Sequence, residues 1–162
     1  MILLNLNDKI KGDSQVPEYE GWITCDTVAF GVDRNVTISG GDRETSNPVF
    51  QEITVSKSSD KASCDLFWQA CGGSSLGKAT IVWLQTAKGD QNQEFMKVEL
   101  AKAIVTGCNV SSGGELTSET ITIGFSEIKV HYTQFKEGET PEAATPRGWH
   151  AFKNSNKLVD LA

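Results

Sequence analysis

The sequence predicts a mainly β fold, built as a two-sheet β-barrel or sandwich with one short α-helix. Apolar residues alternate with polar or small residues along most of the 162-residue chain, which is the pattern of half-buried strands. Helical spacing between two end signals occurs once, from Ser63 to Gly73. Two expected strands, residues 95–106 and 117–133, are longer than usual, and such length favours the strong coiling of a barrel.

The expected strands begin at the N-terminus, where Ile2, Leu4 and Leu6 keep one phase. The second strand, residues 21–32, has a face of large residues and a face of small ones, because alternate side chains of a strand point to opposite sides. The core face is expected to carry Trp22, Val28 and Phe30, and the outward face Cys25, Thr27, Ala29 and Gly31.

The later strands differ in how far they are buried. A third strand is expected at residues 49–55, and residues 79–86 are apolar on both faces, which indicates a central strand. Within residues 117–133 the apolar phase switches at Ser126–Glu127. This switch predicts a bulge or bend where one strand passes between two sheets. A short last strand is expected to contain Trp149.

The helix has recognisable end signals. Ser63 is expected to cap it, and Asp65 lies in its first turn, where a carboxylate interacts favourably with the helix dipole. Gly72-Gly73 is expected to end it. Loops rich in Gly, Ser, Asn, Asp and Pro are expected at residues 34–48, 88–90, 109–114 and 136–147.

Length and charge limit the classes of function. Residues 1–162 are expected to form a single domain, since a chain of this length buries a sufficient core. The net charge of −6 argues against a nucleic-acid partner, because phosphate binding needs clustered Lys and Arg. No segment reaches membrane-spanning length, so no membrane insertion is expected. The N-terminus lacks the basic start and apolar run of a signal peptide, which predicts cytosolic synthesis and folding.

Residues capable of catalysis or metal binding form no known pattern. His131 and His150 belong to no metal-ligand motif, and no GxSxG elbow is present. We therefore expect no catalytic residue, metal or cofactor and predict that the chain is not an enzyme. A hydrolase with a cysteine or serine nucleophile near one histidine stays an alternative. In the cytosol we expect the cysteines to be free, buried thiols: Cys25, Cys64, Cys71 and Cys108.

Residues 72–79, with the sequence GGSSLGKA, nearly fit the phosphate loop GxxxxGK[ST]. Ala79 stands where the Mg²⁺-binding hydroxyl belongs. A phosphate loop also follows a strand and opens a helix, whereas here a helix comes before and a strand after. We interpret this segment as a Gly-rich connection from helix to strand.

Tryptophans suggest a second function class. Three of the four lie in apolar periodic segments, where core packing is the usual role. Trp68 follows Phe67 on the short helix and is expected to be partly exposed. A β-sandwich carbohydrate-binding module is therefore the main alternative.

A set of short segments stands in order along nearly the whole chain. They are Ile10-Lys11-Gly12-Asp13-Ser14, Tyr19-Glu20-Gly21-Trp22-Ile23, residues 55–63 (VSKSSDKAS), Leu66, Ala70-Cys71, Ser111-Ser112-Gly113-Gly114, Glu119, Phe125-Ser126-Glu127-Ile128 and Gly148-Trp149. Together they resemble the haemolysin-coregulated protein (Hcp) family. The chain departs from the family at Cys64, where members often have the proline that suits the first helical position.

The resemblance implies a fold like that of phage tail-tube proteins and a structural role in a bacterial type VI secretion system. It implies hexameric rings that stack into the inner tube, sheath and spike partners, and small effector proteins in the lumen. The machine would export the protein without a signal peptide. The resemblance places Thr27, Ala29 and Gly31 on the channel wall, facing effectors. It assigns a loop that contacts a neighbouring subunit or ring to residues that include Asn35, Gly40, Gly41, Asp42, Arg43 and Asn47.

Overall fold

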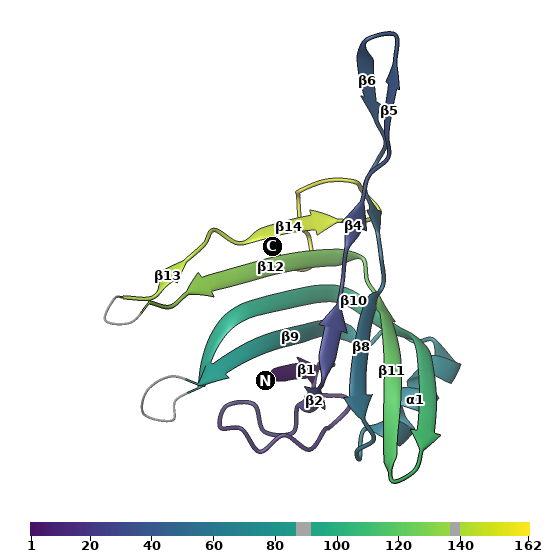
Figure 1. Cartoon of the computed structure of the whole chain (residues 1–162), viewed down its shortest axis with the longest axis vertical. Coiled ribbons are helices and arrows are strands. Elements are labelled where there is room, and N and C mark those ends of the chain that lie inside the picture. The colour runs from purple at the N-terminus through teal and green to yellow at the C-terminus, as the bar shows by residue number, and fades with distance from the viewer. Residues whose placement is uncertain (87–91, 137–139) are drawn as a thin grey trace.

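The computed structural model describes residues 1–86, 92–136 and 140–162, which are mainly β with one α-helix, as predicted (Figure 1). The strands are β1 (Ile2–Asn5), β2 (Ile23–Cys25), β3 (Thr27–Ala29), β4 (Val32–Asp33), β5 (Val36–Ser39), β6 (Asp42–Thr45), β7 (Val49–Phe50), β8 (Ile53–Ser58), β9 (Gly77–Thr86), β10 (Asn92–Gly113), β11 (Leu116–Gly124), β12 (Glu127–Gln134), β13 (Glu142–Ala143) and β14 (Arg147–His150). The helix α1 (Ser63–Gly72) lies at the end of the molecule opposite the β5–β6 hairpin.

The longest strand, β10, has 22 residues and belongs to both sheets. Its first half lies between β9 and β12, and its second half pairs with β11. The change occurs near Lys102, whose backbone has a positive φ of 51° and lies where the β9 pairing shifts register. The two strands that pair with β10 are separated in the same region, since β11 ends at Gly124 and β12 begins at Glu127. The predicted passage between two sheets at Ser126–Glu127 is therefore confirmed.

Two sheets enclose the main core. One contains β2, β1, β9, the first half of β10, β12, β13 and β14, and the other contains the second half of β10, β11, β8 and β3. The chain also crosses between them at Asp26, between β2 and β3. No ladder joins β2 to β3 in the described residues, so the two sheets do not close into a hydrogen-bonded barrel. β9 pairs with both β1 and β10, which confirms its predicted central place.

The crossing at Asp26 changes the phase expected for the second strand. Before the bend Cys25 is buried in the main core, and after it Val28 and Phe30 pack against that core. Placing Cys25 on the small outward face is therefore wrong. Trp22 lies beside neither Val28 nor Phe30, which corrects its predicted position. It packs in a separate cluster with Leu3, Val82, Leu84, Val16 and Tyr19.

The predicted cap of α1 is also wrong in detail. Ser63 is the first helical residue, and Ala62 occupies the cap position without a side-chain cap. The Ser63 hydroxyl instead accepts the N–H of Asp60 at 2.9 Å, and the Asp60 carboxylate accepts the N–H of Ala62 at 2.9 Å. The turn before the helix is thus held by its own side chains. At the other end Gly73 takes the left-handed conformation (φ 61°), as Gly72-Gly73 predicted.

Two expected loops are regular structure. Residues 34–48 contain the β5–β6 hairpin, which projects from the body. Residues 109–113 lie in β10 and pair with β11, so the flexible connection expected at residues 109–114 is wrong and the turn is confined to Gly114–Glu115. The hairpin turn expected at residues 88–90 lies outside the described residues. The last expected loop contains β13, with residues 137–139 also outside them.

The cysteines divide into two groups. Cys25 is buried and Cys108 half-buried, but Cys64 and Cys71 are exposed, so the expectation of buried thiols is wrong for these two. Both lie on α1, where Leu66 is the buried residue. Within the residues that the structure describes, no His, Cys, Asp and Glu side chains gather as a metal site, and no helix is long and apolar enough to cross a membrane.

Candidate functional site

The outward face of the second sheet is a neutral, hydroxyl-rich surface. The strand registers place its residues in three rows across β3, β8, β11 and β10. We call this surface the hydroxyl face. Its rows are Thr27, Ser56, Thr120 and Asn109; Ala29, Thr54, Thr122 and Gly107; and Ser58, Ser118 and Ser111. All of these side chains are uncharged, so the face offers hydrogen-bonding groups without a net charge.

Hydrogen bonds tie the hydroxyl face across its strands. The Thr27 and Ser56 hydroxyl oxygens are 2.6 Å apart, and the Thr106 hydroxyl donates to that of Thr122 at 3.0 Å. Thr27 and Ala29 are both exposed. Gly31 lies beyond the end of β3, where a Cβ would come 3.2 Å from the Gln51 Oε1. The structure therefore brings Thr27 and Ala29 together and leaves Gly31 at the margin.

The sequence contained a signal for this face that the prediction did not use. Along β8, Ile53, Val55 and Lys57 are buried, while Thr54 and Ser56 between them are only half-buried. β11 shows the same alternation, with Thr120 and Thr122 between buried residues. Polar residues at every second position of two neighbouring strands predict one common polar face.

The outward face of the first sheet has the opposite character. There Glu99 pairs with Lys78 and lies 2.7 Å from the His131 Nε2. Burial alone would raise the pKa of Glu99, but the hydrogen bonds from Lys78 and His131 hold it below its usual value. Lys129, which lies opposite Glu99 in the β10–β12 register, donates to the carbonyl of Leu161 at 3.0 Å. The first sheet thus presents charges on its outward face, whereas the three rows of the hydroxyl face carry none, and Glu52 lies beyond them beside Gly124.

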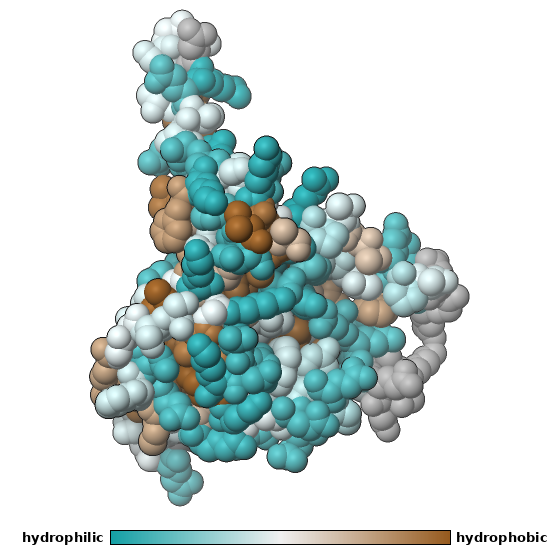
Figure 2. Space-filling model, turned by 180° about the vertical axis from the view of Figure 1, so that it is seen from behind, coloured by the Kyte–Doolittle hydropathy of each residue, from teal (hydrophilic) through white to brown (hydrophobic). Residues whose placement is uncertain are grey.

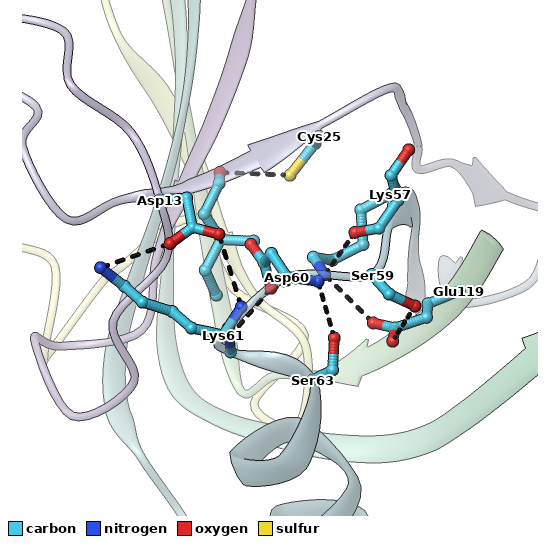
Figure 3. A network of polar contacts seen from close by, with 11 residues as sticks. Asp13, Cys25, Lys57, Ser59, Asp60, Lys61, Ser63 and Glu119 are labelled. Atoms are coloured by element: carbon cyan, nitrogen blue, oxygen red, sulfur yellow. Dashed lines mark hydrogen bonds and ion pairs between the residues drawn. The ribbon is translucent and has the colours of Figure 1, made fainter. Parts of the chain in front are cut away.

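A buried ionic network lies on the core side of the hydroxyl face (Figure 3). Lys57 is fully buried and contacts Asp60 at 2.8 Å and Glu119 at 3.1 Å. The Ser59 hydroxyl donates to the other Glu119 oxygen at 2.8 Å. Burial alone would raise the pKa of Glu119, but hydrogen bonds from Ser63, Ser59 and Lys57 lower it. Every charge here has a partner, so the network joins β8, β11 and the start of α1 and leaves no free base.

The loop residues named from sequence lie on or beside the projecting hairpin. Gly40 and Gly41 form its tip with positive φ values of 58° and 95°, which glycine adopts without strain. Asn35 closes the base, where its N–H bonds the Ser46 hydroxyl at 3.0 Å. Asp42 and Arg43 lie in β6. The Asn47 carboxamide oxygen accepts the Asn154 side chain at 2.6 Å, which ties the hairpin base to the C-terminal segment.

Two hollows lie at the base of this hairpin. One, of about 480 Å³, is lined by Phe30, Val32, Phe50, Val130, Trp149 and the two arginines Arg34 and Arg147. The other, of about 570 Å³, is lined by Phe50, Glu52, Lys102, Ile104, Phe125 and Phe152. Figure 2 shows hydrophobic residues gathered below the hairpin, surrounded by hydrophilic ones. These hollows are apolar surfaces suited to docking and have no cluster of catalytic groups.

The residues considered for catalysis are arranged for other roles. His131 contacts Glu99, and His150 lies 3.5 Å from Glu127 and accepts the N–H of Lys153. Within the described part of the chain neither ring is hydrogen-bonded to a Cys or Ser side chain. Burial raises the pKa of Cys25 to about 12, the opposite of an activated thiol. Residues 1–86, 92–136 and 140–162 therefore contain no assembled nucleophile–base pair that involves these histidines.

The segment that resembled a phosphate loop follows the C-terminal end of α1, where Gly73 donates to the Gln69 carbonyl. A helix C-terminus repels anions, so this position is unsuited to a phosphate. Lys78 from the same segment pairs with Glu99. The interpretation as a connection from helix to strand agrees with this geometry.

Trp68 is 74% exposed on α1, as its sequence context predicted. It lines neither of the two hollows at the hairpin base. A carbohydrate platform normally places aromatic rings beside polar groups in a concave surface. Trp68 has an exposed neighbour in Phe67 instead, which makes this helix face an apolar patch.

Both the sequence and the fold of this chain are similar to those of known proteins. The family model described as "Type VI secretion system effector, Hcp" matches residues 3–132, which leaves Gly148-Trp149 beyond the match. A solved structure described as a type six secretion system protein is 21% identical, covers 95% of this chain and 97% of its own, and has a TM-score of 0.85. Hcp1 from Salmonella typhimurium is 19% identical over 94% of this chain and 95% of its own, with a TM-score of 0.76. A type VI secretion system effector from Yersinia pestis is 15% identical over 93% and 99%, with a TM-score of 0.72. No curated protein matches the sequence.

Proposed function

The chain belongs to the Hcp family of type VI secretion systems, and we propose that it forms hexameric rings that stack into the inner tube of such a machine. In this proposal the protein has a structural role and no catalytic one. It is made in the cytosol and exported by the machine itself. Sheath and spike proteins are its partners outside the ring, and small effector proteins travel in the lumen.

The observation that carries the proposal is the hydroxyl face. A channel wall must stay hydrated and must not hold its cargo strongly. Charged side chains act over longer distances than neutral dipoles and attract or repel whole proteins according to their charge. Ser, Thr and Asn side chains stay hydrated without that effect. We therefore assign the hydroxyl face, with Thr27 and Ala29 at its edge and Gly31 beside it, to the lumen.

The hairpin supports the assembly part of the proposal. It projects from the body, and its tip and strands carry the residues assigned to contact between subunits or rings: Asn35, Gly40, Gly41, Asp42, Arg43 and Asn47. When a protruding element meets a different surface on the next copy and the contact repeats in one direction, the contact is head-to-tail. Such contacts close into a ring when the rotation between copies permits it.

Electron microscopy of gold-labelled rings tests the assignment. The starting variant carries Cys64→Ser and Cys71→Ser, which removes the exposed thiols. Adding Ser56→Cys should place a maleimide-linked gold particle at the centre of each ring. The matched control, Gln134→Cys at an exposed position at the end of β12, should place the particle outside the centre. Label from Ser56→Cys at the outer rim would contradict the lumen assignment, and a protein that forms no ring at all would contradict the tube role.

A further inference from the structure

The projecting hairpin has one face without a partner. The register pairs Ile38 with Arg43 and Val36 with Thr45, so these four side chains share a face, while Glu44 is on the other. Val36 is 54% and Ile38 70% exposed. β5 and β6 pair only with each other among the described strands. An isolated two-stranded hairpin is only marginally stable in water, so its exposed apolar residues indicate a surface that becomes covered.

One of the two hollows is lined by apolar side chains that suit the apolar face of the hairpin. The larger hollow, which we call the Phe152 groove, is the one of about 570 Å³ that contains Phe50, Ile104, Phe125 and Phe152. Phe152 is 81% exposed, the largest fraction among the exposed large hydrophobic residues of the described chain. The groove therefore presents apolar side chains that would gain from being covered.

The charged residues that line the two hollows indicate which of them can receive the hairpin. The apolar face of the hairpin includes Arg43. The smaller hollow is lined by two arginines, Arg34 and Arg147, against one carboxylate, Asp33, so its lining is net positive and would repel Arg43. The Phe152 groove contains Glu52. Neither Arg43 nor Glu52 has an ion pair in the part of the chain that the structure describes, whereas the groove's Lys102 lies 3.7 Å from Asp160. An unpaired arginine on the hairpin thus matches an unpaired glutamate in the groove.

A hairpin that docks in the Phe152 groove must come from another molecule. Pro48 and Phe50, which line the groove, follow the hairpin directly in sequence, and the hairpin points away from the body (Figure 1). We propose that the Val36–Ile38–Arg43 face of one copy docks in the Phe152 groove of a second copy, with Arg43 paired to Glu52. This inference rests on the proposed ring function and adds to it the receiving surface and a specific ion pair.

Charge reversal tests the pairing. Arg43→Glu and Glu52→Lys should each weaken self-association about tenfold or more, because each places like charges in contact. The double variant Arg43→Glu/Glu52→Lys should regain wild-type assembly. A mixture of the two single variants should also assemble, since every contact in an alternating arrangement then joins opposite charges. Sedimentation velocity over a concentration series measures the association, and native mass spectrometry measures the equal composition of mixed assemblies.

Controls separate this contact from a general effect. Glu44→Lys, on the other hairpin face, should leave assembly unchanged, while Ile38→Ser should weaken it. Val36, Ile38, Arg43 and Glu52 are all exposed, so each variant should keep the thermal midpoint of the wild-type monomer. Rings that form normally in both single variants would overturn the inference and leave the proposed function standing. So would a double variant that stays dissociated. A wild-type protein that remains monomeric at high concentration would overturn both.

Discussion

Lys57 and Glu119 face each other across the β8–β11 ladder, with the lysine Nζ 3.1 Å from a carboxylate oxygen and both side chains almost fully buried. The pair lies directly behind the hydroxyl face, and Asp60 completes it at 2.8 Å from the same Nζ. A buried charge without its partner is strongly unfavourable. This network therefore fixes how β8, β11 and the start of α1 fit together.

Removing Lys57 should destabilise the protein more than removing Glu119. Lys57→Met leaves the buried carboxylate of Glu119 and the half-buried one of Asp60 without a cation, and we expect a loss of about 3–5 kcal/mol in the free energy of unfolding. Glu119→Gln should cost less, because Lys57 keeps Asp60. Urea unfolding followed by circular dichroism measures both. The control is Lys11→Met, which breaks the exposed Lys11–Asp8 pair and should cost under about 1 kcal/mol. Equal losses for Lys11→Met and Lys57→Met would refute a buried network.

The same network should make stability depend on pH. The folded state lowers the pKa of Glu119, so its contribution is present above the pKa of an unfolded glutamate, about 4.3, and is lost as the pH falls through the folded pKa. Glu99 and Glu127 also have lowered pKa values and add to the loss. The free energy of unfolding of wild type should therefore fall below about pH 4.3, and that of Glu119→Gln should fall less steeply. Parallel curves for the two proteins would contradict this account.

The buried pair also shows where sequence prediction succeeds and fails. The alternation along β8 and β11 places Lys57 in phase with Ile53 and Val55, and Glu119 in phase with Ile121 and Ile123. Periodicity alone cannot show that two charges on different strands meet, because that depends on strand register. The central place of β9, the passage at residues 126–127 and the glycine end of α1 depend on local signals and were predictable.

The errors have a common physical origin. Cys25 is small enough to suit either face, so nothing in its neighbourhood showed that the phase changes at Asp26. Ser63 is a good cap residue, but its hydroxyl already bonds the preceding turn. The sequence predicted a small-residue outward face on one strand, with Thr27, Ala29 and Gly31. The hydroxyl face as a whole needed the register of β8, β11 and β10. Short local patterns identify single strands and helices, whereas the face of a sheet is formed by several strands together.

Glu127 should hold the C-terminal segment. It is fully buried and accepts the N–H groups of Val159, Asp160 and Leu161 at 2.9, 3.1 and 3.0 Å. Glu127→Gln replaces one acceptor oxygen by a donor, so we expect a loss of about 1.5–3 kcal/mol in stability. Hydrogen exchange of these three amides should become faster, and mass spectrometry of the C-terminal peptide measures it. The exposed control Glu142→Gln should change neither quantity. Unchanged exchange in Glu127→Gln would show that the carboxylate does not hold the segment.

Gly12 should tolerate no side chain. A Cβ at this position would clash with the Ile23 Cα and the Trp22 carbonyl oxygen, and would lie 2.7 Å from the Ile23 nitrogen. All three are backbone atoms, which cannot move aside as a flexible side chain can. Gly12→Ala is expected to lower the free energy of unfolding by about 1–3 kcal/mol, the range for overpacked sites. In Gly72→Ala a Cβ would meet nothing within 4 Å, and helix propensity favours alanine, so stability should hold or rise slightly. Thermal unfolding of both variants gives the comparison, and a Gly12→Ala protein as stable as wild type would show that the neighbouring segment shifts freely.

The cysteines should react with iodoacetamide in a graded order. Alkylation requires the thiolate, and burial raises the pKa of Cys25 to about 12 while its side chain is almost inaccessible. Cys64 and Cys71 are exposed on α1 and should be alkylated first at pH 8. Burial also raises the pKa of half-buried Cys108, which should react more slowly. Peptide mass spectrometry at timed intervals measures each site, and the same reaction in denaturant should modify all four equally. Rapid native labelling of Cys25 would mean that β2 opens at the Asp26 bend, and the continuity of the core between the two sheets would then have to be abandoned.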